Sequence, residues 1–247
     1  MFQKVEGTVD LGDGSKSNLQ ATQALVFMLT AVNSNFKIPV GYYLIHSLNG
    51  SNRAKLLKTV IENVNETGAI ILGVTSDNPS TNISMFQHLG AKLSGDALKT
   101  SIDIKNCSGR YISVILDAVH CLKLIRNALA ELGKLLSPDN EPILWKHIVN
   151  LNDLQKEHNV HIANKITNKH VFFSNNKMNV KLAAQTFSTS TAKAIKFCNA
   201  TLKLPQFKQC DATVECIQFV DSMFDILNSK SLRDKMFKVC NIISILF

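Results

Sequence analysis

The sequence predicts an α/β protein with a mixed β-sheet, followed by a second part that is mostly α-helical. Short apolar runs alternate with amphipathic helical segments up to residue 136, which is typical of α/β folds. Two of these runs are separated by only a short turn, which adds an antiparallel hairpin to the sheet. After residues 137–142, SPDNEP, no β-branched run exceeds three residues, so the second part is predicted to be mostly helical.

The first part begins with the hairpin. Residues 24–32, ALVFMLTAV, and residues 36–45, FKIPVGYYLI, are predicted strands, and VNSN is the turn between them. Residues 51–68 form a predicted amphipathic helix that starts at Ser51 or Asn52 and stops at Gly68. The run AIILGVTS follows it, and its residues Ile70, Ile71, Leu72 and Val74 indicate a strand buried on both faces.

The remaining elements alternate strands and helices up to residue 136 and are predicted helices after it. TNISMFQHLGA predicts a short helix, and the strand YISVIL precedes a long helix that reaches residue 136. Beyond SPDNEP, three amphipathic segments predict helices: residues 143–159, 179–202 and 211–232. The sequence therefore indicates a domain boundary near residues 137–142.

The amino-acid composition excludes few classes of function. The 247 residues carry a net charge of +8, which permits a nucleic-acid partner, although many basic proteins bind none. The six cysteines form no CxxC pair, as suits a reduced intracellular compartment. No apolar run approaches the ~18–20 residues of a membrane span, and no GxGxxG, GxxxxGK[ST] or GxSxG motif is present.

Two acids stand where strands end. Asp77 follows the run AIILGVTS, and Asp117 follows YISVIL. Acids at the carboxyl ends of buried strands are typical metal ligands in α/β enzymes, but they also commonly cap the next helix. His120 lies one turn after Asp117, where a histidine is more often packed or hydrogen-bonded than a metal ligand.

Five segments, taken in order, resemble the P element transposase family, which includes the THAP-domain transposases of animals. They are GVTSDNPSTNISMFQHLGA, LDAVHCLKLIRNAL, ILWKHIVNLNDLQ, ANKITNKHVFFSNNKMNVKLAAQTFSTSTAKAI and QCDATVECIQFVDSMFDILNSKS. The resemblance runs from about residue 5 to residue 233, and KMNVKLAAQTFS and FDILNS are its most distinctive stretches.

The resemblance implies a fold and an activity. In this family an RNase H-like domain, with a mixed sheet and flanking helices, binds divalent metal through three acids and cuts DNA, and a helical insertion domain binds GTP. The expected domains are residues 1–137 as the RNase H-like core without its first strand, residues 138–235 as part of the insertion domain, and residues 236–247 as a divergent tail.

The resemblance also assigns a metal ligand. Asp77 matches the family's second acid, whereas the first and third acids are expected to fall outside this sequence. Two metal ions would clamp the attacking and leaving oxygens of a phosphodiester, and Mg²⁺ favours carboxylate ligands. Asp10 is a possible substitute for the first acid. A weaker alternative is a different RNase H-like nuclease that uses Asp10, Asp77 and Asp117 together.

For the nucleotide, the resemblance points to the FDxxNS motif of the last predicted helix. Phe224 could stack on the base, and Asp225 could accept two hydrogen bonds from guanine that adenine does not offer. The other candidates are Asn228 beside them, Lys165 and Lys181 for the phosphates, and Ser190 as a hydroxyl donor. Without the resemblance, the same residues are typical of ordinary helix packing.

The sequence therefore predicts a fragment or decayed copy of a P element-type DNA transposase, inactive on its own, with Mg²⁺ and GTP as cofactors of the parent activity. The alternative is a domesticated module or repressor that keeps guanine-nucleotide or DNA binding without catalysis. Nuclear localisation and possible homo-oligomers are expected, and a membrane is not. Non-specific DNA phosphate contacts are expected from four residues: Arg53, Lys55, Lys123 and Arg126.

Overall fold

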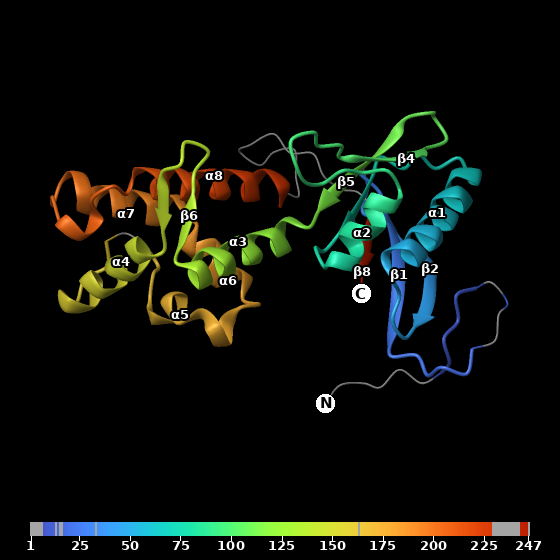
Figure 1. Ribbon diagram of the computed structural model, residues 1–247, viewed down its shortest axis with the longest axis horizontal. Helices are drawn as coiled ribbons and strands as arrows, with labels where there is room; N and C mark the ends of the chain where they lie inside the picture. The colour runs from blue at the N-terminus through green and yellow to red at the C-terminus, as the bar shows by residue number, and fades with distance from the viewer. Residues whose placement is uncertain are drawn as a thin grey trace. The chain divides into compact units, whose positions relative to one another are not determined.

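The computed structural model describes residues 7–12, 14, 17–32, 34–162, 164–228 and 243–246. These residues form two compact units, each with its own core (Figure 1). The sheet unit comprises the described residues up to Asp117 together with residues 243–246. The helical unit runs from Ala118 to the end of the last described helix. The predicted boundary at residues 137–142 falls inside the helical unit.

A six-stranded mixed sheet builds the sheet unit, in the order β2-β1-β8-β3-β5-β4. The hairpin β1–β2 is antiparallel, β3 runs parallel to β5 and to β8, and β4 pairs antiparallel with β5. Strand β8, from the tail expected to be divergent, lies between β1 and β3. The elements are β1 (Gln23–Thr30), β2 (Lys37–Ile45), α1 (Gly50–Glu66), β3 (Gly73–Ser76), α2 (Ser80–His88), β4 (Ser101–Lys105), β5 (Tyr111–Leu116) and β8 (Ile243–Leu246).

Helix α1 forms where the sequence places it and packs on the hairpin. Its N-cap is Asn49, whose side chain accepts a hydrogen bond from the backbone N–H of Asn52 at 2.9 Å. The apolar stripe of the helix faces the core, with Leu57 and Ile61 fully buried. A Cβ at Gly41 of β2 would lie 3.0 Å from Val60, so the absence of a side chain there lets α1 approach the sheet closely.

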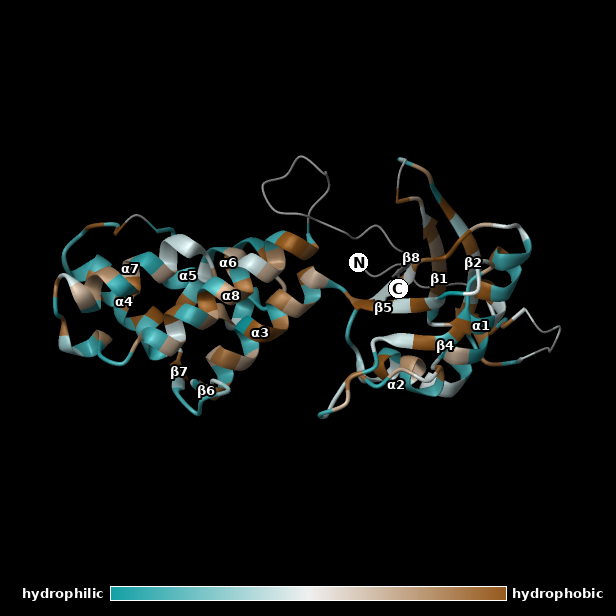
Figure 2. Cartoon of the chain, turned by 90° about the horizontal axis from the view of Figure 1, so that it is seen from above, coloured by the Kyte–Doolittle hydropathy of each residue, from teal (hydrophilic) through white to brown (hydrophobic). Residues whose placement is uncertain are grey.

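The run before Asp77 is shorter as a strand than predicted. Ile71 and Val74 are buried, but Ile70 and Leu72 are 57% and 48% exposed, so the segment is not buried on both faces. Only Gly73–Ser76 forms β3. Strand β4 was not predicted at all, because SIDIK is short and polar on one face. Figure 2 shows β1 largely in the brown of apolar residues, as its sequence QALVFMLT requires.

The helical unit packs helices around a second core and carries one small antiparallel hairpin, β6–β7. The expected helix over residues 179–202 is two helices, because Ser188 caps a new start. No helix in the described residues is long and apolar enough to cross a membrane. The elements are α3 (Ala118–Leu132), β6 (Lys134–Leu136), β7 (Pro142–Leu144), α4 (Lys146–Glu157), α5 (Asn168–Val171), η1 (Phe173–Asn176), α6 (Val180–Thr186), α7 (Thr189–Ala200), η2 (Pro205–Phe207) and α8 (Asp211–Leu227).

Candidate functional site

Asp77 lies at the end of β3 in a fixed hydrogen-bond chain. The Nδ2 atom of Asn82 donates to Asp77 Oδ1 at 2.6 Å, and Arg53 Nη1 donates to Asn82 Oδ1 at 2.8 Å. Asn82 is fully buried on α2, so it holds the carboxylate in one orientation. The N-cap position of α2 is Pro79, so Asp77 does not serve as the helix cap that the alternative interpretation expected.

Asp117 reaches the same edge of the sheet. Ser76 of β3 pairs in register with Leu116 of β5, so the residues that follow them, Asp77 and Asp117, leave neighbouring parallel strands side by side. The backbone N–H of Asp117 donates to the carbonyl of Ser76 at 2.9 Å, which fixes this proximity. The two strand-end acids therefore begin side by side at one edge of the sheet.

The three-acid alternative fails in the structure. Asp10 is an exposed residue whose carboxylate accepts a hydrogen bond from the Gly12 N–H at 2.8 Å in a local turn. Its backbone bridges to Leu44 of β2. Within the part of the chain that the structure describes, no three His, Cys, Asp or Glu side chains gather as a metal cluster. Asp10, Asp77 and Asp117 therefore do not converge on one ion.

In the helical unit, α8 contacts the start of α7 one turn before its predicted nucleotide residues. Phe224 is half-buried against the core, whereas Asp225 and Asn228 are exposed on the last turn of α8. One turn earlier, Asp221 Oδ2 accepts hydrogen bonds from the backbone N–H and the hydroxyl of Thr189, at 2.7 and 2.6 Å. This contact brings the beginning of α7 beside the exposed end of α8.

Ser190 belongs to that same junction. Its hydroxyl lies 2.9 Å from the hydroxyl of Ser188, which caps α7 by accepting from the backbone N–H of Thr191. Ser188 Oγ also donates to the carbonyl of Gln185 at 2.9 Å, so the end of α6 is tied to the start of α7. Ser190 thus lies at the start of α7, where the N–H groups of Thr189 and Thr191 are already paired with Asp221 and Ser188.

The two lysines come from other elements. Lys181 is exposed in the first turn of α6, where Asn179 caps the helix by accepting from Leu182 N–H at 3.1 Å. Lys165 is exposed in the loop between α4 and α5. Among the described residues, neither lysine forms an ion pair with Asp225, and Lys165 is held by a separate set of contacts.

Gln155 of α4 holds the Lys165 loop through a single buried side chain. Its Oε1 atom accepts from the Ile162 N–H at 3.0 Å and from Asn164 Nδ2 at 2.9 Å, and its Nε2 atom donates to the Ile166 carbonyl at 3.4 Å. The loop borders a cavity of about 210 Å³, lined by the end of α4 and residues 159–161 and 166–168. Lys165 therefore lies between Asn164 and Ile166, which Gln155 holds by hydrogen bonds.

The comparisons with known proteins follow this division into two units. The family model described as "TNP-like, RNase H N-terminal domain" matches residues 2–90, and "TNP-like, GTP-binding insertion domain" matches residues 119–240. Human DNA transposase THAP9 is 28% identical over 238 residues, which cover 95% of this chain and 26% of that protein. The chain belongs to the P element transposase family.

A solved member of the P element transposase family has the same fold. The Drosophila P element transposase strand transfer complex matches 95% of this chain and 51% of that chain, with a TM-score of 0.73 and 22% identity. The Transposable element P transposase of Drosophila melanogaster is 27% identical over 175 residues, which cover 70% of this chain and 22% of that protein. The chain thus spans about a quarter of these curated relatives, and the predicted fold class is confirmed.

Two of the expected phosphate contacts of this family member are wrong. Arg53 is only 8% exposed and donates to Asn82 and to the Leu48 carbonyl. Arg126 is fully buried, and burial lowers its pKa. It donates to the carbonyls of Asn176 and Lys177, both at 3.0 Å. Both arginines therefore organise the protein interior. Lys55 is exposed and Lys123 is half-buried, so these two contacts stay predictions.

Sequence reasoning missed the residues that hold the nucleotide candidates in place. Asp221, Gln155 and Thr189 look like ordinary helix-surface residues in the sequence, because their partners lie 7 to 32 residues away. The one local signal was Ser188 in FSTST, since serine followed by a helical run is a typical N-cap. It would have predicted the start of α7 and hence the position of Ser190.

Proposed function

We propose that the helical unit binds a guanine nucleotide at the junction of α7 and α8, as a GTP-binding module of a transposase-derived protein. What supports this proposal is that Asp221, one turn before exposed Asp225 and half-buried Phe224, contacts the start of α7. The match to a GTP-binding insertion domain supports it.

Each side chain has a role that its position allows. The Asp225 carboxylate would accept hydrogen bonds from the N1–H and the exocyclic amine of guanine, and Phe224 would contribute its aromatic face. Ser190 and Asn228 would add polar contacts at the same junction. Lys181 and Lys165 would approach the phosphates from α6 and from the α4–α5 loop. Since the chain has no phosphate-binding loop of the GxxxxGK[ST] type, hydrolysis is not part of the proposal.

Isothermal titration of the full chain with GTP and with ATP tests this proposal. We expect binding of GTP that is at least tenfold tighter than binding of ATP, and its loss in Asp225→Ala. Lys146→Ala, a charge change on α4 away from the junction, is the control and should leave the affinity within twofold. Equal affinities for the two nucleotides, or an unaffected Asp225→Ala variant, would overturn the assignment.

We propose that the sheet unit carries the parent family's catalytic edge. Asp77 and Asp117 leave adjacent strands, and because Mg²⁺ selects carboxylates, these two residues would be its ligands here. The ion would polarise a phosphodiester oxygen, while Asn82 keeps the Asp77 carboxylate oriented toward it. We infer that the chain alone does not cut DNA, since the family's chemistry needs three acids.

Cleavage of DNA in Mg²⁺ or Mn²⁺ tests the inactive-alone inference. No product is expected from the wild-type chain, and cutting that is lost in Asp77→Asn would refute it. A non-catalytic module or repressor acting on DNA in the nucleus is the second candidate, and GTP-selective binding without cleavage would favour it. Self-association is a further prediction, which light scattering on the full chain measures.

A further inference from the structure

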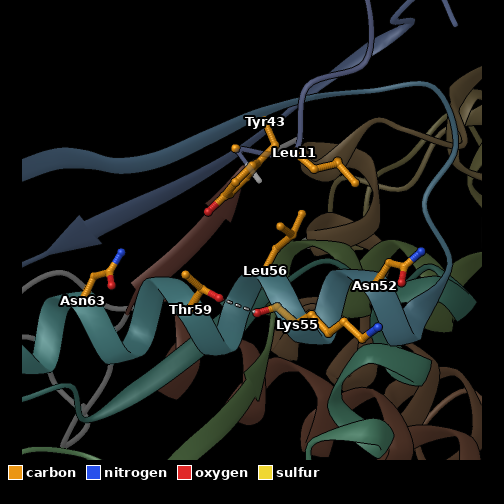
Figure 3. Close-up of a pocket in the computed structure, with 8 residues that line it drawn as sticks. Leu11, Tyr43, Asn52, Lys55, Leu56, Thr59 and Asn63 are labelled. Atoms are coloured by element: carbon orange, nitrogen blue, oxygen red, sulfur yellow. Dashed lines mark hydrogen bonds between the residues drawn. The ribbon is translucent and has the colours of Figure 1, made fainter. Parts of the chain in front are cut away.

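A groove of about 490 Å³ runs along one face of α1 and includes Lys55, one of the predicted phosphate contacts (Figure 3). Five residues of α1 form its floor: Asn52, Lys55, Leu56, Thr59 and Asn63. They share a face because their spacing follows the helical repeat. Tyr43 of β2 and the loop residues Leu11 and Gly12 form the opposite wall. Its volume falls in the range of ~300–1,000 Å³ that is typical of small-ligand sites.

Residues 10–12, which border the groove, are tied to the sheet. The backbone of Asp10 pairs with Leu44 on β2, and the Asp10 carboxylate accepts from the Gly12 N–H. Gly12 has a φ of +72°, and a Cβ there would lie 3.4 Å from the Tyr43 ring. Because this turn brings Gly12 against the Tyr43 ring, this wall of the groove is formed before any ligand binds. Figure 3 shows Tyr43 and Leu11 facing Leu56 across the groove.

Among the described residues that line the groove, Lys55 is exposed and carries the one charge, and none is a carboxylate. Burial raises the pKa of the Tyr43 phenol, which therefore stays neutral and can donate or accept a hydrogen bond. Across the described part of the chain, the side-chain amides of Asn52 and Asn63 have no hydrogen-bond partner. Their donors and acceptors are available to a ligand.

This combination matches a nucleotide within a single strand. A phosphodiester carries one negative charge, which Lys55 would meet. An aromatic ring and two leucines offer apolar contact to a base and sugar, and asparagine amides can bond to base edges. A nucleoside triphosphate would bring several negative charges to a single lysine, so the groove is poorly suited to a free triphosphate.

One end of the groove adjoins the Asp77 edge. Asn52 precedes Arg53, whose guanidinium donates to Asn82, and Asn82 donates to Asp77. From Lys55 to Asn63 the helix rises by about 12 Å, at 1.5 Å per residue. We propose that this groove binds a single-stranded segment of DNA that leads away from the Asp77 edge along α1. The inference rests on the proposed role of the sheet unit in acting on DNA.

The test is fluorescence anisotropy of the full chain with a fluorescein-labelled oligothymidylate, over a series of salt concentrations. Lys55→Ala should weaken binding at least fivefold and reduce the slope of log K against log salt by about 0.7, the value for one lost phosphate contact on a single strand. Tyr43→Leu should weaken binding without changing the slope. Unlabelled duplex should compete less well than unlabelled single strand.

Lys58→Ala is the matched control. Lys58 lies on the same helix, carries the same charge and pairs with Glu62 at 3.8 Å outside the groove. Its loss should change affinity by less than twofold. Equal effects of Lys55→Ala and Lys58→Ala would overturn the groove while leaving DNA binding intact. A wild-type chain that binds duplex but no single strand would overturn the groove alone, and one that binds neither would also overturn the proposed action on DNA. Both lysines are exposed, so the comparison holds even if Tyr43→Leu fails to fold.

Discussion

Asp221 on α8 accepts two hydrogen bonds from Thr189, one from its backbone N–H and one from its hydroxyl, at 2.7 and 2.6 Å. The contact spans two helices and satisfies a donor at the α7 N-terminus that would otherwise point to solvent. The negative charge also lies at the positive end of the α7 dipole. Asp221 therefore fixes the junction at which we place the nucleotide.

Replacing Asp221 by alanine should lower the free energy of unfolding by about 1–2 kcal/mol, as for loss of a helix cap with a charged acceptor. Urea unfolding followed by circular dichroism measures this change. Asp225→Ala, one turn along the same helix, is the control: its carboxylate is exposed, so stability should move by less than ~0.5 kcal/mol. Equal losses from the two variants would contradict the capping role.

In the helical unit, the sequence predicts the long helices but not the short hairpin or the long-range contacts. Helices α4 and α8 were predictable because their apolar residues recur at helical spacing and face the core. The hairpin β6–β7 was missed, since each strand has only three residues and its partners are set by tertiary packing. The family motif gave Asp225, but no local pattern gives Asp221 or Gln155, whose roles arise only when distant segments meet.

Gln155→Ala should weaken GTP binding through Lys165, because three hydrogen bonds from Gln155 hold the loop that carries this lysine. We expect at least a fivefold loss for GTP and little change for guanosine, which has no phosphate. Lys165→Ala should cause a similar loss, and the double variant should lose no more than the stronger single variant, as expected for coupled residues.

Asn150→Ala is the matched control for that experiment. Asn150 also lies on α4 and ties down a different loop, by donating to the Gln206 carbonyl at 2.8 Å. Its loss should cost stability comparable to one hydrogen bond but leave GTP affinity within twofold. If Gln155→Ala weakens GTP and guanosine equally, or if Asn150→Ala has the same effect, Gln155 acts on general stability and not through Lys165.

The helical unit should lose stability in mild acid. His147 and His170 are each 2% exposed, and burial lowers the pKa of both below 6.5, with nearby Arg126 adding to the shift of His170. Thr167 N–H donates to Nδ1 of His170, so its proton lies on Nε2, 3.1 Å from Gln185 Oε1. Both rings are therefore neutral in the folded protein at neutral pH.

The direction of the pH dependence of the free energy of unfolding follows from proton binding by the two histidines. Below pH ~6.5 the unfolded chain protonates these histidines and the folded chain does not, so the free energy of unfolding falls as pH decreases. The slope is at most about 1.4 kcal/mol per pH unit for each histidine, and it ends below the folded pKa. Urea unfolding between pH 5 and pH 8 measures it. His170→Gln should flatten the profile, and an unchanged profile in both His170→Gln and His147→Gln would contradict the explanation.

In the sheet unit, the sequence predicts the long strands but not the short ones. The hairpin β1–β2 and helix α1 appear close to their expected bounds, because alternation and helical periodicity are strong signals over eight or more residues. The prediction that the run around Ile70 is buried on both faces was wrong, because an apolar run does not show which neighbouring elements cover its side chains. The register that puts Asp117 beside Asp77 depends on long-range strand pairing, which one sequence does not reveal.

Gly50 should be intolerant of a side chain, because it sits where α1 and α2 meet. A Cβ there would lie 2.3 Å from Ser84 Oγ and 2.9 Å from the backbone nitrogen of Met85. The side chain of Ser84 can rotate, but the backbone of α2 must shift, which costs about 1–3 kcal/mol. Ser51→Ala, at the next position of α1, is the control and should change the midpoint of urea unfolding only slightly. Gly50→Ala should lower that midpoint clearly, and equal midpoints for the two variants would show that the helices can separate at Gly50 without cost.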